Sequence, residues 1–346
     1  MSEIEKIDKN FAVGTENTDN MIYFGCTEKP FRLYGIIQSD GGFLRMPQNI
    51  ADDINDGVKS LNKNTAGGRV RFVTDSPCIS IRAKMTSIGK MPHFALTGSA
   101  GFDLYADNDY IGTFVPPFKI TDGYESKLAT GFTGQRLVTV NFPLYSSVSS
   151  LEIGLAAGAS LSAADDYSVS RPVVYYGSSI TQGGCASRPG NSYESIISRL
   201  LDCDYINLGF SGSARGEQAM AEYIAGLDMS AFVLDYDHNS PSSHHLKETH
   251  FPFYLTVREK NPDLPIIMLS RPQSRLNESE KKRRDIILKT YVAAVDRGDK
   301  NVYFIDGGEI LNIFGSDSGT VDNCHPNDLG FMCMAKAIGS VLKKVL

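Results

Sequence analysis

The sequence has 346 residues, of which 42% are hydrophobic and 21% are charged, and its net charge at pH 7 is −6. This composition is typical of a globular protein, and the length predicts about two domains. The absence of a basic block argues against a nucleic-acid partner, and the absence of an apolar run of about 18 residues argues against a membrane span.

The chain begins with a polar, acidic segment, M-S-E-I-E-K-I-D-K-N, which contains no apolar stretch typical of a signal peptide. Its six cysteines are scattered singly, and no pair has C-x-x-C spacing. We therefore expect a cytoplasmic protein with reduced thiols.

Residues 1–168 predict an all-β domain. Short runs rich in β-branched and aromatic residues alternate with Gly, Asp and Asn turn signals. The runs are residues 21–26, 31–37, 70–74, 79–85, 110–115, 137–140 and 151–155. Many short strands separated by turn residues favour a β-sandwich. We find no catalytic cluster in this half.

A small, polar stretch at residues 160–170 marks the expected boundary between domains 1–168 and 169–346. Beyond it, apolar runs that predict strands alternate with helical patterns, and the first helix has its apolar residues at helical spacing with Asn191 as the expected cap. The strands are expected at residues 173–176, 205–208, 232–236, 265–269 and 302–305, and the helices at about 191–201, 217–224, 278–296 and 331–342. This alternation predicts a parallel sheet in an α/β domain.

Distinctive residues follow the predicted strands at their carboxyl ends, where open parallel sheets carry their chemistry. Ser179 follows the first strand, Gly212 the second and Asn239 the third. Asp322 and His325 follow the fifth, three residues apart. Each residue alone fits a helix cap or a turn, but their coincidence at one edge of a sheet favours a catalytic site.

The chemistry of this set is that of a serine hydrolase. The hydroxyl of Ser179 needs a base, which His325 can supply, and Asp322 can hold the imidazole in the required tautomer. The backbone N–H groups of Ser179 and Gly212 and the side-chain amide of Asn239 can stabilise an oxyanion.

In its second half the chain resembles the SGNH hydrolases, also called GDSL hydrolases. The matching segments are G-S-S-I-T at 177–181, S-G at 211–212, H-N at 238–239 and D-N-C-H at 322–325. The family usually has Asp in place of Ser178 and Gly-x-Asn-Asp around Asn239, so Asn239 matches less closely than Ser179. The resemblance implies a flavodoxin-like, three-layer domain with a Ser179–His325–Asp322 triad and no cofactor.

The segment G-F-D-L-Y at 101–105 resembles the signature of a β-sandwich domain found ahead of some bacterial SGNH hydrolases. The resemblance implies a carbohydrate O-acetylesterase, whose substrate would be a small-molecule ester or an imported acetylated oligosaccharide. A lipid or thioester acyl hydrolase is the alternative within the same chemistry. The alternative from another class is a non-catalytic glycan-binding protein.

Three further residues are candidates for substrate contact, because they lie near the same edge of the sheet: Arg188, His238 and Arg271. Arginines on a surface usually form solvated ion pairs instead, and loop histidines are usually exposed. The histidines between residues 238 and 250 lack the spacing of a zinc site, so we expect no metal. The sequence leaves the oligomeric state open.

Overall fold

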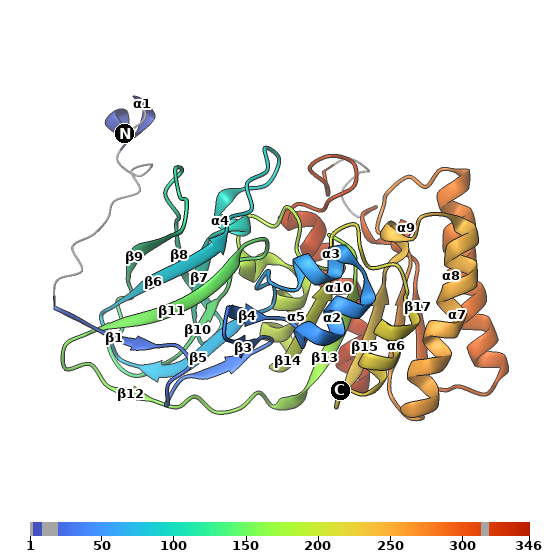
Figure 1. Cartoon of the computed structure of the whole chain (residues 1–346), viewed down its shortest axis with the longest axis horizontal. Coiled ribbons are helices and arrows are strands. Elements are labelled where there is room, and N and C mark those ends of the chain that lie inside the picture. The colour runs from blue at the N-terminus through green and yellow to red at the C-terminus, as the bar shows by residue number, and fades with distance from the viewer. Residues whose placement is uncertain (1–2, 9–19, 313–317) are drawn as a thin grey trace.

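The structure is a computed structural model that describes residues 3–8, 20–312 and 318–346. A β-rich N-terminal half lies beside an α/β C-terminal half, and helix α1 (Glu3–Ile7) lies apart from both (Figure 1). Among the described residues, none of the helices has the length and apolar character needed to cross a membrane.

Two antiparallel sheets form the N-terminal sandwich, which confirms the predicted fold of this half. The first sheet has the order β1-β11-β6-β9, and the second has the order β12-β5-β10-β7-β8, with β2 also paired to β5. Their bounds are β1 Met21–Gly25, β2 Arg32–Tyr34, β5 Arg69–Thr74, β6 Cys78–Ser87, β7 Phe102–Ala106, β8 Asp109–Phe114, β9 Gly123–Ala129, β10 Arg136–Asn141, β11 Ser147–Ala156 and β12 Leu161–Ser162. A hairpin of β3 (Ile37–Ser39) and β4 (Gly42–Leu44) completes the strands.

Strand β5 shows how alternation sets the two faces of the second sheet. Val70 and Phe72 are fully buried in the core of the sandwich. Arg69 and Arg71 point the other way, toward the C-terminal half, and are nevertheless buried. The outer face of this sheet is therefore not solvent-exposed but covered by the second half of the chain.

Short helices interrupt the first half, which we expected to be all β. They are α2 (Gln48–Ile54), α3 (Asp56–Leu61) and α4 (Leu96–Ser99). Ala51 and Val58 of α2 and α3 pack into the same core cluster as strands of the C-terminal half. Helices of only one or two turns leave almost no periodic signal in a sequence.

The C-terminal half holds a five-stranded parallel sheet with the order β14-β13-β15-β16-β17, which is the flavodoxin-like 2-1-3-4-5 order. Helices α5 and α10 cover one face of the sheet, and α6, α7 and α8 cover the other. The bounds are β13 Val169–Gly177, β14 Cys203–Gly209, β15 Ala231–Asp235, β16 Ile266–Leu269, β17 Val302–Ile305, α5 Tyr193–Leu201, α6 Gln218–Ala225, α7 Ser243–Lys260, α8 Glu278–Asp296, α9 Gly307–Ile310 and α10 Asp328–Val345. The predicted α/β domain is thus confirmed strand by strand.

One local prediction is wrong, and one long helix was not predicted. Helix α5 is capped by Ser192, whose hydroxyl accepts the N–H of Ser195, while Asn191 belongs to a short 3-10 turn before it. The long helix α7 went unpredicted, because Pro252 lies inside it and its first turn carries histidines in place of a clear apolar stripe.

Candidate active site

Ser179, His325 and Asp322 form one hydrogen-bonded line. Ser179 sits in the turn that follows β13, with its Oγ 3.0 Å from Nε2 of His325. The other ring nitrogen of His325, Nδ1, lies 2.8 Å from Oδ2 of Asp322. Ser179 is 9% exposed and the other two are partly exposed, so the line is reachable from solvent.

The turn around residues 322–325 orients Asp322 before any substrate is present. Its Oδ1 accepts the backbone N–H groups of Cys324 at 3.1 Å and His325 at 2.7 Å. Partial burial favours a higher pKa for the Asp322 carboxyl, but the hydrogen bonds from His325 outweigh it and lower the pKa. The carboxylate therefore stays ionised and can stabilise a protonated imidazole.

The loops that carry the three expected oxyanion donors are joined by hydrogen bonds, since the N–H of Phe210 donates to the carbonyl of Gly177 at 2.8 Å. Gly212 has φ +67°, a backbone conformation that favours glycine, and a Cβ there would meet open space. Within the described chain, the N–H groups of Ser179 and Gly212 have no hydrogen-bond acceptor. The side-chain amide of Asn239 donates to the carbonyl of Phe210 at 2.8 Å, which fixes it beside the Gly212 loop.

Gln182 is a site residue that the sequence did not indicate. Its fully buried side chain accepts the N–H of Ser211 at 3.0 Å and donates to Asn64 at 3.1 Å and to the carbonyl of Leu144 at 3.2 Å. One amide thus connects the nucleophile turn, the loop that carries Gly212 and the sandwich domain. No local pattern could reveal this role, because the partners lie far away along the chain.

The sandwich domain also reaches the nucleophile directly. The hydroxyl of Tyr145 donates to the carbonyl of Ser179 at 3.1 Å, and the ring of Phe94 packs on the edge of Tyr145. The exposed imidazole of His93 lies 5.9 Å from the ring of His325, centroid to centroid. The N-terminal domain therefore contributes part of the wall of the site.

His93, Cys185 and His325 are a group that could hold a metal, since their ligand atoms lie within 4.8 Å of one another. Burial raises the pKa of the Cys185 thiol to about 12, so the thiol is protonated near neutral pH. Nε2 of His325 already faces Ser179. These donors therefore suit a serine hydrolase better than a resident metal site.

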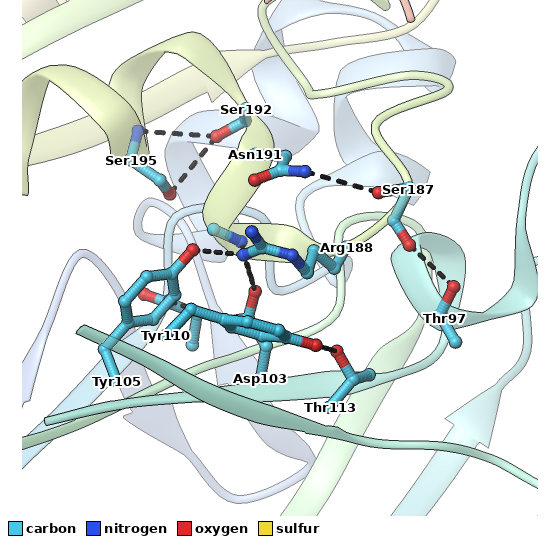
Figure 2. Close-up of polar contacts among 12 residues, drawn as sticks. Thr97, Asp103, Tyr105, Tyr110, Thr113, Ser187, Arg188, Asn191, Ser192 and Ser195 are labelled. Carbon is cyan, nitrogen blue, oxygen red and sulfur yellow. Dashed lines mark hydrogen bonds and ion pairs between the residues drawn. The ribbon is translucent and has the colours of Figure 1, made fainter. Parts of the chain in front are cut away.

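Arg188 lies in a clasp between the two domains, which is drawn in Figure 2. Its guanidinium donates to the hydroxyl of Tyr105 and lies 3.4 Å from Asp103, and it stacks 3.8 Å above the ring of Tyr110. Asp103 also accepts the N–H of Gly190 at 2.7 Å. The G-F-D-L-Y segment, which is mostly strand β7, thus holds the two domains together. The guanidinium of Arg188, which we expected to contact substrate, is bound to this segment instead.

His238 lies beside Cys324 of the turn that carries Asp322 and His325, and Arg271 lies close enough to act on its charge. Nδ1 of His238 is 3.8 Å from the sulfur of Cys324. Burial, followed by the positive charges of Arg271 and His325, keeps the pKa of His238 well below its usual value, so its ring is neutral. Arg271 forms an ion pair with Glu280 at 2.9 Å and is largely buried, so its charge is already compensated.

Comparison with known families gives two matches that together cover most of the chain. The model of the GDSL-like lipase/acylhydrolase family matches residues 170–343. The model described as the N-terminus of Esterase_SGNH_hydro-type, GxDLY, matches residues 21–161. No curated protein matches the chain at a significant level.

Solved structures match over the whole chain. A protein from Bacteroides ovatus ATCC 8483, described as a GDSL-like lipase, is 32% identical with a TM-score of 0.83, covering 94% of this chain and 98% of its own. A salicylyl-acyltransferase from a tetracycline biosynthetic pathway is 20% identical with a TM-score of 0.77, covering 95% and 98%. An acetyl xylan esterase from the rumen bacterium Butyrivibrio proteoclasticus is 14% identical with a TM-score of 0.59, covering 94% and 98%. The last two share the fold.

Proposed function

Because the chain belongs to the GDSL-like lipase/acylhydrolase family and is a carboxylic ester hydrolase, we propose that it removes short acyl groups, chiefly acetyl, from carbohydrates. The observation that carries the proposal is the hydrogen-bonded line from Ser179 through His325 to Asp322. A nucleophile, a base and an orienting carboxylate in this order are what acyl transfer to a serine needs.

In the proposed mechanism, Nε2 of His325 takes the proton of Ser179 Oγ as that oxygen attacks the ester carbonyl. The N–H groups of Ser179 and Gly212 and the amide of Asn239 stabilise the oxyanion of the tetrahedral intermediate. His325 then gives its proton to the leaving sugar hydroxyl, and an acyl-enzyme remains. Water, deprotonated by His325, releases the acid and restores Ser179.

The polar surroundings of the triad favour a neutral carbohydrate ester. The exposed imidazole of His93 lies near the triad, and Arg271 is neutralised by Glu280, so an anionic substrate gains little there. The loops after the first and third strands are rich in small polar residues, which suits a small acyl group. The acetyl xylan esterase of the same fold acts on such a substrate.

The decisive experiment measures acetate release from acetylated xylo- and manno-oligosaccharides, alongside p-nitrophenyl esters from acetate to octanoate. We expect Ser179→Ala to lower kcat by about 10⁴-fold or more, because the nucleophile is lost. Ser178→Ala is the matched control, since within the described residues the hydroxyl of this buried neighbour accepts the N–H of Ile180 and makes no other hydrogen bond.

The outcomes separate the candidate functions. Activity that falls as the acyl chain lengthens supports an acetylesterase. Activity that rises with chain length moves the protein to lipid or thioester substrates. Equal rates for wild type and Ser179→Ala on every ester would exclude Ser179 as the nucleophile and leave a glycan-binding role.

A further inference from the structure

A cavity lies between the domains, and no residue of the triad lines it. It has a volume of about 480 Å³, which is in the range that holds a small ligand. Its floor is the outer face of the second sandwich sheet, with Arg71 and Thr139 on neighbouring strands, and its wall is helix α5, with Ser198 and Arg199. Neither Ser179, Asp322 nor His325 lines it.

Arg71 is the unusual residue of this cavity. It is 4% exposed, and within the described chain no hydrogen bond joins its Nε or Nη1 to any acceptor. Its guanidinium lies over the ring of Tyr167, 3.9 Å from the centroid, which orients it without neutralising it. A buried cation without an acceptor is costly unless something else pairs with it.

Two other arginines, Arg69 and Arg199, also line the cavity. Arg69 pairs with Asp204 and also bonds to the hydroxyl of Tyr167, so its charge is compensated. Arg199 donates to the carbonyl of Gly190 at 2.7 Å, but no carboxylate in the described part of the chain forms an ion pair with it. Arg71 and Arg199 therefore both line one cavity, and within the described residues neither of them forms an ion pair with a carboxylate.

Four acidic residues also line the cavity, and within the described residues none of them forms an ion pair with Arg71 or Arg199. Asp107 pairs with Arg136, and Asp166 pairs with Arg32. Asp202 accepts the N–H of Ser168 at 3.1 Å. Asp165 is exposed to solvent.

We infer that this cavity binds the oxyanion of a small hydroxylated molecule, namely a sugar acid or a sugar phosphate, with Arg71 as the principal anchor. A guanidinium presents a planar fork of donors that matches a carboxylate or a phosphate. The ring of Tyr167 and the polar side chains of Thr139 and Asn141 suit the hydroxylated remainder. The ligand would contact both domains, and so it would also stabilise their docking.

The test is calorimetric titration of the full chain with D-glucuronate, with glucose 6-phosphate and with neutral glucose. We expect at least one anion to bind, with glucose at least tenfold weaker, and a higher Tm with the bound anion. Glucuronate alone would identify a carboxylate ligand, and glucose 6-phosphate alone a phosphate. No binding of either anion, or equal binding of glucose, would overturn the inference.

Three variants make the test specific. Arg71→Gln should weaken anion binding at least tenfold, and Thr139→Phe, which fills the cavity beside Arg71, should do the same without changing any charge. Arg82→Gln is the control, because Arg82 also stacks on a tyrosine in the sandwich but pairs with Glu125. Unchanged binding in both cavity variants would contradict the proposal. The readout is binding, so it is independent of the esterase reaction.

Discussion

At the scale of single residues, Gln182 shows how the geometry of the site depends on a side chain that takes no part in the chemistry. Its amide joins the loop of Gly212 to the turn of Ser179 and to the sandwich. Since oxyanion donors act only when correctly placed, small shifts of this loop matter for the rate.

We therefore expect Gln182→Leu to lower kcat for p-nitrophenyl acetate about 10- to 100-fold with little change in KM. The variant also leaves buried polar partners unpaired, which costs about 1–3 kcal/mol of unfolding free energy. Steady-state kinetics at a temperature where the variant is folded, together with thermal unfolding, check both effects.

The matched control is Gln218→Leu, because Gln218 is on the surface and, in the described part of the chain, its side chain bonds to Glu222 and Thr256 alone. It should keep the kcat of the wild type. A Gln182→Leu variant with full kcat would show that Gln182 does not position the oxyanion loop.

The sequence indicated Ser179, Asp322 and His325 because each of them lies in a short motif that directly follows a predicted strand. The same reasoning missed Gln182, Tyr145 and His93. Their roles arise from contacts between domains, across 34 residues for Tyr145 and 118 for Gln182 with Asn64. Contacts between residues so far apart produce no recognisable spacing in the sequence.

At the scale of elements, helix α7 carries a buried titratable group. His250 is fully buried and stacks on Tyr236, and within the described residues its Nδ1 has no hydrogen-bond partner. Burial lowers the pKa of His250 from 6.5 to about 3. The folded protein therefore keeps this ring neutral where the unfolded chain takes up a proton.

Stability should consequently fall as the pH drops from about 6.5 toward 3, by up to about 1.4 kcal/mol per pH unit from this group. His250→Phe keeps an aromatic ring on Tyr236 but cannot bind a proton. Urea unfolding between pH 7 and pH 4 should show a shallower loss of stability for this variant.

His244→Phe is the control on the same helix, because His244 is exposed. It should follow the pH dependence of the wild type. Identical slopes for His250→Phe and the wild type would show that His250 does not contribute to acid destabilisation.

The elements that the sequence predicted best are the five parallel strands. Strands β15 and β16 are buried along their whole length, as are the last five residues of β13, so these three strands read as largely apolar runs. Strand β7 was overlooked as a strand, because its five residues include a buried Asp103 that serves the domain contact instead of the core.

At the scale of the whole molecule, the clasp around Asp103 joins the sandwich to the hydrolase domain. The carboxylate is fully buried and is held by Asn141, Gly190 and Arg188. Burial raises the pKa of Asp103, and these donors partly offset the rise.

Removing this carboxylate in Asp103→Ala should cost about 3–5 kcal/mol, because it leaves the charge of Arg188 unpaired in a largely buried site. Urea unfolding followed by far-UV circular dichroism and by tyrosine fluorescence measures the loss, since the chain has no tryptophan. Asp109→Ala, which removes an exposed ion pair with Arg136, should cost less than about 1 kcal/mol. Equal effects of the two variants would show that the clasp contributes no more than a surface pair.

The bond from Tyr145 to the carbonyl of Ser179 limits how this protein can be recombined with others. A sandwich taken from another hydrolase would bring a different surface to the nucleophile turn and to Gln182. Chimeras that exchange whole domains should therefore lose turnover unless both partners of each contact between the domains are taken from the same protein. The sandwich and the hydrolase domain therefore have to be exchanged together, even though each has its own fold.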